Sequence, residues 1–380
     1  MKPKKKILVF VDWYLPGYKA GGPIRSVANM VGNLKDEFDF YIVTRNVDYC
    51  EITPYSSIRS DAWNQLSDGE RVYYISSKKL SHSTLKKIIN AKPWDVYYIN
   101  GIYSYYFSIL PALLLRKNKQ NQVTIAPRGM LAKSAISIKV TKKKTFLSVA
   151  KLIGLYKNVA FHATNENEKN EIITELGEHT VRVVPNLPKK NTGIGWQQKI
   201  KKENELKLAI IARISPEKNQ QFALELMKNL SGNVSLNLYG PVYNETYWSL
   251  CRKIISDLPH NISANYFGSV ESDKIEKKLE EHHFLLMPTL GENFGHIILE
   301  SLSVGCPVII SDQTPWKELE NKRVGWDISL NNTEKFASVL QKCVNMGQEE
   351  YDELSKSAFV YAQSIINDST VVDQYEKIFY

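Results

Sequence analysis

The sequence predicts an α/β protein made of two Rossmann-like domains, each a parallel sheet covered by helices. Short apolar runs such as residues 6–11 and 284–287 lead into glycine-bearing loops and then into helical patterns, which is the order of a parallel sheet. The chain has 380 residues, which is too long for a typical single core. A polar, lysine-rich stretch at residues 189–206 separates the two patterns and is interpreted as a linker.

Composition limits the classes of function. Hydrophobic residues make up 43% and charged residues 23%, as in ordinary soluble proteins. The four cysteines show no metal-type spacing, so a reducing cytosol is expected. The basic, briefly apolar start predicts a first strand and not a signal peptide. The net charge of +9 suits phosphate-bearing ligands or an anionic surface, and without a recognisable motif nucleic acid is not an expected partner.

The first domain is expected over residues 1–188. After its first strand comes a loop that ends in Gly21 and Gly22, followed by a helix at residues 24–34. A strand, a glycine loop and a helix together can hold phosphate, although this signal alone is weak. Further strands are predicted at residues 38–43, 72–75, 95–99, 123–126, 159–163 and 181–184.

Two polar residues of this domain follow buried strands, where chemistry is expected in such sheets. Asn100 ends the run at residues 95–99, and Arg128 follows the run at residues 123–126. The planar fork of Arg128 suits a pyrophosphate or carboxylate of an acceptor, and a structural arginine paired with a neighbouring carboxylate is the equally weighted alternative. His162 lies within a strand pattern and is predicted to be a hydrogen-bonded core residue.

A helix at residues 139–151 places three consecutive lysines, 142–144, beside Phe146 and Leu147. A solvated helical face is the first interpretation. An interfacial helix on anionic lipid is the second, and a lipid-linked acceptor would favour it.

The second domain is expected over residues 207–368, with strands at 208–211, 234–239, 284–287 and 307–310. Arg213 and Lys218 lie on the loop after its first strand, and two cations there complement a diphosphate without a metal ion.

The loop at residues 291–295 leads into a helix at residues 296–304, whose N-terminus is expected to face the carboxyl ends of parallel strands. Such a place favours phosphate. Glu292 and Glu300 would repel an anion, so we expect them to bind neutral sugar or ribose hydroxyls.

The words GENFGHIILESLSVGCPVIISD resemble the donor-site signature of the family-4 retaining glycosyltransferases, which have the GT-B fold. An acidic residue, Phe-Gly, a second Glu eight positions after the first, and the Gly-x-Pro-Val and Ser-Asp segments all match. The words APRGML resemble a subgroup that builds cell-surface polysaccharides such as lipopolysaccharide and capsule. The resemblance implies two Rossmann-like domains facing across a cleft, retention of anomeric configuration, and neither metal nor cofactor. It implies a nucleotide-sugar donor and a glycan or lipid-linked acceptor, in the cytoplasm or peripherally on the inner face of the plasma membrane.

The resemblance also implies roles for residues. Arg213 and Lys218 would stabilise the departing diphosphate and Glu292 would hold the donor sugar, while Asn100 and Arg128 would bind the acceptor. The residues expected to bind the donor are Gly21, Gly22, Val270, Asn293, Phe294, Gly295, His296 and Glu300. The sequence departs from the family at Ala212 and Asn219, where glycine is usual, and no histidine lies near Asn100. The final helix, residues 369–380, would cross back to the first domain.

Two other functions are weighed. A nucleotide-sugar epimerase uses the same scaffold but needs acid and base groups that the first domain's strand ends do not offer. A non-catalytic polyanion- or membrane-binding protein would not need Glu292, Glu300, Arg213 and Lys218, all of which are present.

Overall fold

The computed structural model describes residues 3–117, 121–132, 135–136, 140–190 and 195–380. The fold is α/β with two Rossmann-like sheets, as predicted. The chain divides into two compact units, one of Met1–Lys190 with Asp368–Tyr380 and one of Asn191–Asn367. The C-terminal helix α13 (Ser369–Phe379) therefore belongs to the same unit as the first strand, β1 (Lys5–Phe10).

The first unit contains an eight-stranded sheet in the order β3-β4-β2-β1-β5-β6-β7-β8, parallel apart from the pair β3 and β4. Phe10 lies opposite Val43 on β2 and Ile99 on β5, so these three strands end at the same edge. The remaining strands are β2 (Phe38–Arg45), β3 (Trp63–Gln65), β4 (Arg71–Ile75), β5 (Val96–Asn100), β6 (Gln122–Ala126), β7 (Ala160–Ala163) and β8 (Val181–Val183).

Helices cover both faces of this sheet because β1 is apolar on both sides. Ile7 and Val9 point to a core shared with α1 (Gly22–Leu34) and α13. Leu8 and Phe10 point to the opposite core. That core includes α2 (His82–Asn90), α3 (Leu110–Leu115), α5 (Val140–Leu152) and α6 (Glu166–Leu176). Lys139, which was predicted to begin the basic helix, lies outside the described residues.

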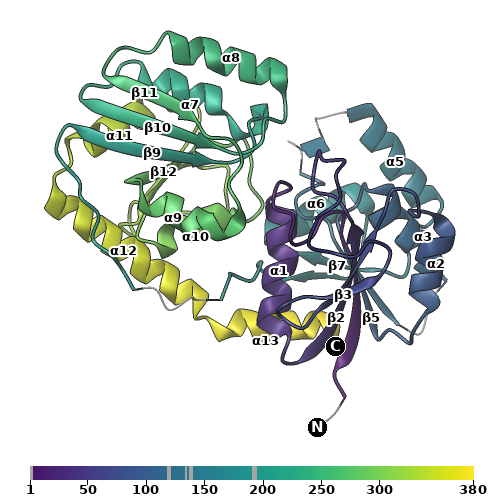
Figure 1. Cartoon of the computed structure of the whole chain (residues 1–380). Helices are drawn as coiled ribbons and strands as arrows, with labels where there is room; N and C mark the ends of the chain where they lie inside the picture. The colour runs from purple at the N-terminus through teal and green to yellow at the C-terminus, as the bar shows by residue number, and fades with distance from the viewer. Residues whose placement is uncertain (1–2, 118–120, 133–134, 137–139, 191–194) are drawn as a thin grey trace. The chain divides into compact units, whose positions relative to one another are not determined.

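The second unit contains a six-stranded parallel sheet in the order β11-β10-β9-β12-β13-β14. Its strands are β9 (Glu205–Ile211), β10 (Asn233–Tyr239), β11 (Ile262–Tyr266), β12 (Phe284–Met287), β13 (Val308–Ser311) and β14 (Gly325–Ile328). One face carries α7 (Gln220–Met227), α8 (Glu245–Ser256) and α11 (Thr333–Asn345). The other carries α9 (Ile275–Glu280), α10 (His296–Ser303) and α12 (Gln348–Ile366) (Figure 1).

The stretch predicted as a linker, residues 189–206, contacts the second unit over its described C-terminal part. The indole N–H of Trp196 donates to Ser355 Oγ at 2.9 Å. The buried ammonium of Lys201 donates to the carbonyls of Val344 and Met346 at 3.3 and 2.8 Å. Residues 196–204 therefore lie against α12 and the end of α11, and residues 191–194 lie outside the described residues.

Candidate functional site

The loop after β9 carries Arg213 and Lys218 at the carboxyl end of a central strand. A short 3₁₀ helix at Pro216–Lys218 turns the chain, and Asn219 then adopts a left-handed conformation, with φ of 58°, to start α7. Asparagine tolerates this conformation better than most residues that carry a side chain. The departure from glycine at Asn219 therefore preserves the turn that places Lys218.

Lys218 and Glu292 form an ion pair, with Nζ 2.6 Å from Oε2. Their side chains are 16% and 22% exposed, so the pair is largely shielded but not closed to solvent. The two loops are also joined through Glu217, whose carbonyl accepts from Leu290 N at 2.8 Å and from Thr289 Oγ1 at 3.0 Å. The structure thus brings together two of the three residues predicted to be catalytic.

Arg213, the third, lies on the same loop but points to another neighbour. Its guanidinium lies 5.1 Å from the ring centre of Tyr243, and its carbonyl accepts from Gln220 Nε2 at 2.8 Å. In the described part of the chain, no ion pair joins Arg213 to a carboxylate. Stacking on an aromatic ring orients a guanidinium while leaving its donors available. Sequence reasoning missed Tyr243, an aromatic residue whose only signal is its place after the next strand.

Gly295 caps the N-terminus of helix α10; it has φ of 77° and is in the left-handed conformation. A Cβ atom at this position would lie 2.8 Å from Ile298 Cδ1 and 3.1 Å from Glu292 Cγ. The turn therefore requires glycine and places Glu292 beside the helix N-terminus. The positive end of a helix, where backbone N–H groups point outward, favours an anion.

Aromatic packing supports the same loop from the side of α12. His296 is buried, and its ring centre lies 4.7 Å from that of Phe294. The indole N–H of Trp316 donates to the Phe294 carbonyl at 2.5 Å. Trp316 thus holds the loop that carries Asn293. Glu300 follows one turn into α10, on the same helix.

Val270 lies after β11 and is partly buried against the core of α9, α10 and α12. Nearby, Phe267 is 58% exposed and stacks on Tyr239 with ring centres 5.3 Å apart. The carbonyl of Gly268 accepts from Gly240 N at 2.7 Å, which joins the ends of β10 and β11. An exposed aromatic ring at these strand ends is a feature that the sequence analysis did not single out.

The remaining predicted site residues lie in the first unit. Gly21 precedes α1 with φ of 69°, and a Cβ atom at Gly21 or Gly22 would meet no other atom within 4 Å. The backbone of this loop is therefore open to close approach by a ligand.

Arg128 is held by its own unit. Its Nε donates to Asn100 Oδ1 at 2.8 Å, its Nη2 donates to Tyr98 Oη at 2.8 Å, and its Nη1 donates to Asn186 Oδ1. The arginine therefore ties the ends of β5 and β6 to the segment after β8. Its partners are neutral groups and not the single carboxylate that the structural alternative had assumed.

His162 is fully buried and hydrogen-bonded, which confirms the sequence prediction. Its Nδ1 lies 2.6 Å from Tyr98 Oη and its Nε2 lies 2.8 Å from the Val184 carbonyl. Burial lowers the pKa of His162 to about 3. The imidazole is thus neutral near pH 7, with Nε2–H donating to the carbonyl and Nδ1 accepting from Tyr98.

Within the described residues, no group of three or more His, Cys, Asp or Glu side chains is arranged to hold a metal ion. None of the helices in that part of the chain has both the length and the apolar character of a membrane span.

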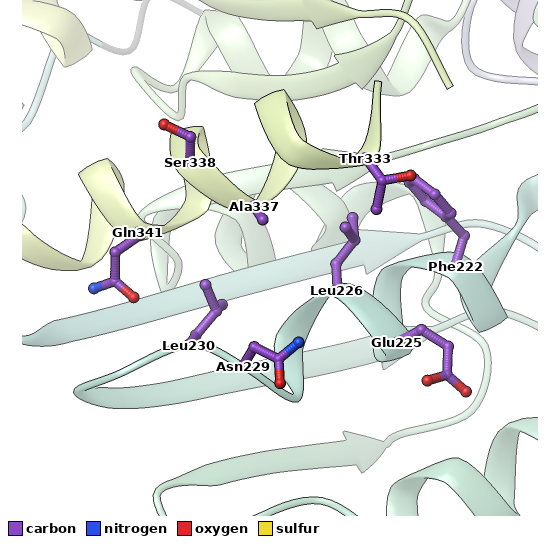
Figure 2. A pocket seen from close by; sticks show the side chains of 9 residues that line it. All are labelled: Phe222, Glu225, Leu226, Asn229, Leu230, Thr333, Ala337, Ser338 and Gln341. Carbon is purple, nitrogen blue, oxygen red and sulfur yellow. The ribbon is translucent and has the colours of Figure 1, made fainter. Parts of the chain in front are cut away.

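A groove of about 380 Å³ lies on the second unit between α7 and α11 (Figure 2). Leu226 and Leu230 line it from one side and Ala337 from the other. It contains none of the predicted site residues, so it is separate from the loops that carry Lys218 and Glu292.

Residues 196–360 match the family model described as "Glycosyl transferases group 1". In a comparison with curated proteins, no relative matches.

Solved structures of similar fold cover nearly the whole chain. Alr3699/HepE of Anabaena, in complex with UDP and glucose, has a TM-score of 0.73 at 13% identity, covering 98% of each chain. Sucrose-phosphate synthase of Thermosynechococcus elongatus has a TM-score of 0.70 at 15% identity, covering 99% of this chain and 98% of the other. WaaG, a glycosyltransferase involved in lipopolysaccharide biosynthesis, has a TM-score of 0.62 at 13% identity, covering 98% and 99%. The fold of the chain is thus GT-B, as the sequence resemblance implied.

Proposed function

We propose that the chain is a retaining glycosyltransferase of the family-4 type that transfers a sugar from a nucleoside-diphosphate sugar to a glycan or lipid-linked acceptor. The carrying observation is the pairing of Lys218 with Glu292 beside the N-terminus of α10, at the carboxyl edge of the second sheet. The match of residues 196–360 to the glycosyltransferase family supports this proposal. The neighbours' complexes and names suggest a nucleotide-sugar donor and a role in cell-surface polysaccharide synthesis.

A carboxylate beside an anion site would repel the anion, and the ion pair of Glu292 with Lys218 reduces this repulsion. Lys218 lies next to Glu292, so its ammonium can offset the carboxylate and still contact a phosphate oxygen. Arg213 and the first N–H groups of α10 add positive potential. Glu292 would then accept hydrogen bonds from hydroxyls of the donor sugar, and Glu300 from those of the ribose.

The reaction requires no metal ion in this proposal. The bond from the anomeric carbon to the diphosphate breaks while the acceptor oxygen bonds to the same carbon from the same face. The acceptor's proton passes to the departing phosphate oxygen. Lys218 and Arg213 stabilise the charge that develops on the diphosphate, as preorganised cations do in a shielded site.

The first unit would bind the acceptor through Asn100 and Arg128, and its loop at Gly21 and Gly22 would bind the donor. Basic and apolar residues share the exposed side of α5: Lys142 and Lys144 are exposed, and Val149 and Leu152 are 47% and 87% exposed. This combination supports peripheral binding to an anionic membrane on the cytoplasmic side.

The test is the release of nucleoside diphosphate from UDP-, GDP-, ADP- and dTDP-sugars by the purified protein, with and without EDTA. We expect one donor to be consumed, slowly with water and faster with a saccharide acceptor, at a rate that EDTA does not change. Retention is read from the anomeric proton coupling of the product by NMR. If none of these donors is consumed, the proposal is wrong. An epimerase would instead convert the donor sugar without releasing the diphosphate.

A further inference from the structure

Three side chains from separate segments meet at the carboxyl edge of the first unit's sheet. Asp12 follows β1, Arg45 ends β2, and Ser104 follows β5. Asp12 Oδ1 accepts from Ser104 Oγ at 2.7 Å, and from Arg45 Nε and Nη2 at 3.4 and 3.3 Å. None of the three was singled out as a site residue from the sequence.

The backbone of Asp12 is held in place, and among the described residues only one of its two carboxylate oxygens accepts side-chain hydrogen bonds. The Asp12 carbonyl accepts from Arg45 N at 3.3 Å and from Thr44 Oγ1 at 3.1 Å, which holds the residue against β2. All the side-chain hydrogen bonds to Asp12 in the described part of the chain reach Oδ1 and leave Oδ2 unused. The side chains of Asp12 and Arg45 are 18% and 30% exposed, so a small ligand can reach both.

The carboxyl group of Asp12 is largely buried and lies beside the positively charged guanidinium of Arg45. Burial raises the pKa of Asp12, and the hydrogen bond from Ser104 and the charge of Arg45 offset part of that increase. Since Asp12 cancels most of the charge of Arg45, the pair is a poor site for a free anion. It is a better site for hydroxyl groups, which can donate to Oδ2 and accept from the guanidinium.

An aromatic wall adjoins the pair. The guanidinium of Arg45 lies 5.9 Å from the ring centre of Trp13 and 5.0 Å from that of Phe107. Trp13 is half-buried and meets the edge of Tyr49 at 4.9 Å. A carboxylate, a guanidinium and a partly exposed indole together match the alternating hydroxyl and C–H surfaces of a pyranose.

The surrounding loops are tied down. Asp48 Oδ2 accepts from the backbone N–H groups of Tyr18 and Lys19 at 3.0 and 3.3 Å. This contact joins the segment that leads to Gly21 and Gly22 to the segment after β2. The site is therefore built on strand ends and braced loops, as precise recognition of a small ligand requires.

We propose that Asp12, Arg45 and Ser104 form a binding site for adjacent hydroxyl groups of a neutral pyranose, with Trp13 as its apolar wall. The proposal rests on the glycosyltransferase function above and assigns this site to the saccharide acceptor. Asp12 and Arg45 contact the sugar, and Ser104 positions Asp12.

Saturation-transfer NMR with millimolar methyl glycosides of neutral pyranoses, including glucose, galactose, mannose and rhamnose, tests this site directly. The wild-type protein should give a signal with at least one glycoside. Asp12→Asn should weaken that signal or its fitted affinity by roughly tenfold or more, because it replaces one acceptor oxygen of the carboxylate with an amide group that donates. Arg45→Lys should weaken it too, because the planar fork is lost.

Asp95→Asn is the matched control. Asp95 lies before β5, at the opposite edge of the same sheet, where its Oδ2 accepts from Lys6 N at 2.7 Å. It should bind the glycoside like the wild type, and thermal unfolding should show that all the variants are folded.

Three results would overturn the inference: no glycoside signal with the wild type, an unchanged signal in folded Asp12→Asn, or displacement of the glycoside by equimolar inorganic pyrophosphate. Binding of nucleoside diphosphates is measured separately and depends on residues of the second unit. A protein that binds nucleotides but no glycoside refutes this site alone, whereas one that binds no nucleotide refutes the proposed function.

Discussion

Single residues of the second unit carry the proposed diphosphate site. Lys218 and Glu292 were both recognisable from the sequence, because each belongs to a short motif with fixed spacing. Their contact at 2.6 Å was not, because it depends on how the loops after β9 and β12 pack. Asn219 shows the same limit: its departure from glycine was visible, but only the structure shows that it keeps a left-handed backbone.

Lys218→Ala should lower turnover by roughly 10²-fold or more, because the departing diphosphate loses one hydrogen-bond donor to its developing negative charge. Steady-state release of nucleoside diphosphate measures this effect. Lys228→Ala is the control, since Lys228 forms an exposed pair with Glu225 at the end of α7. Turnover of Lys218→Ala close to the wild-type value would refute the role of Lys218.

Gly295→Ala should destabilise the second unit by about 1–3 kcal/mol, because alanine would be forced into a left-handed conformation. The new methyl group would also press on Glu292 and Ile298. Urea unfolding followed by tryptophan fluorescence measures the change. Gly195→Ala, where a Cβ atom meets nothing within 4 Å, should be nearly neutral. Equal stability of the two variants would mean that the loop relaxes without cost.

Secondary-structure elements were predictable where they are buried on both faces. β1, β5, β9 and β12 each contain a continuous apolar run, and their positions were expected within a few residues. No strand was predicted at β3, β11 or β14. The edge strands β3 and β11 are largely exposed, and β14 contains Gly325 and Asp327, so none of them shows a clear apolar pattern. The segment before α3 is a π-helix, Tyr105–Ile109, and Pro111 follows in the first turn of α3.

Helix α13 packs into the first unit through Tyr375, Ile378 and Phe379, all fully buried. Phe379→Ala should cost about 3–5 kcal/mol of that unit's stability, as large aromatic truncations in cores do. Its ring lies against those of Phe38 and Tyr98, at 5.3 and 5.8 Å. If each unit unfolds in its own calorimetric transition, the transition of the first unit alone should move to lower temperature. Val360→Ala, with a 65% exposed side chain on α12, should leave both transitions unchanged. A loss of less than 1 kcal/mol would mean that α13 is not part of the folded core.

At the scale of the whole molecule, the fold class and the presence of two sheets followed from the order of apolar runs and loops. The polar network around Arg128 did not, because it joins β5 to the loops after β6 and β8 through neutral partner side chains that have no motif of their own. The cluster of Asp12, Arg45 and Ser104 was invisible for the same reason, since strand order brings together residues 12, 45 and 104.

Both units should lose stability as the pH falls below neutral, because each buries a neutral histidine. Burial lowers the pKa of His162 to about 3 and that of His283 to about 4. An unfolded histidine has a pKa of about 6.5, so below that pH the unfolded chain takes up protons that the folded chain does not. At pH 5 each histidine should cost about 2 kcal/mol relative to pH 7 or above.

Urea unfolding at pH 7 and pH 5 measures this loss. Relative to the wild type, His162→Asn should show a smaller difference between the two pH values, whatever its absolute stability. His260→Asn, at an exposed position, should retain the wild-type difference. An unchanged pH dependence in His162→Asn would mean that the buried imidazole does not control acid stability.

Nucleotide binding by the second unit is tested most directly by thermal unfolding of the purified protein with UDP, GDP, ADP, dTDP and CMP, each with and without EDTA. A ligand at about 100 times its dissociation constant adds about 2.7 kcal/mol of stability. We predict that one nucleoside diphosphate raises the midpoint, that EDTA does not alter the shift, and that Lys218→Ala reduces it. A panel in which no nucleotide moves the midpoint would contradict a nucleotide-sugar site at Arg213, Lys218 and Glu292.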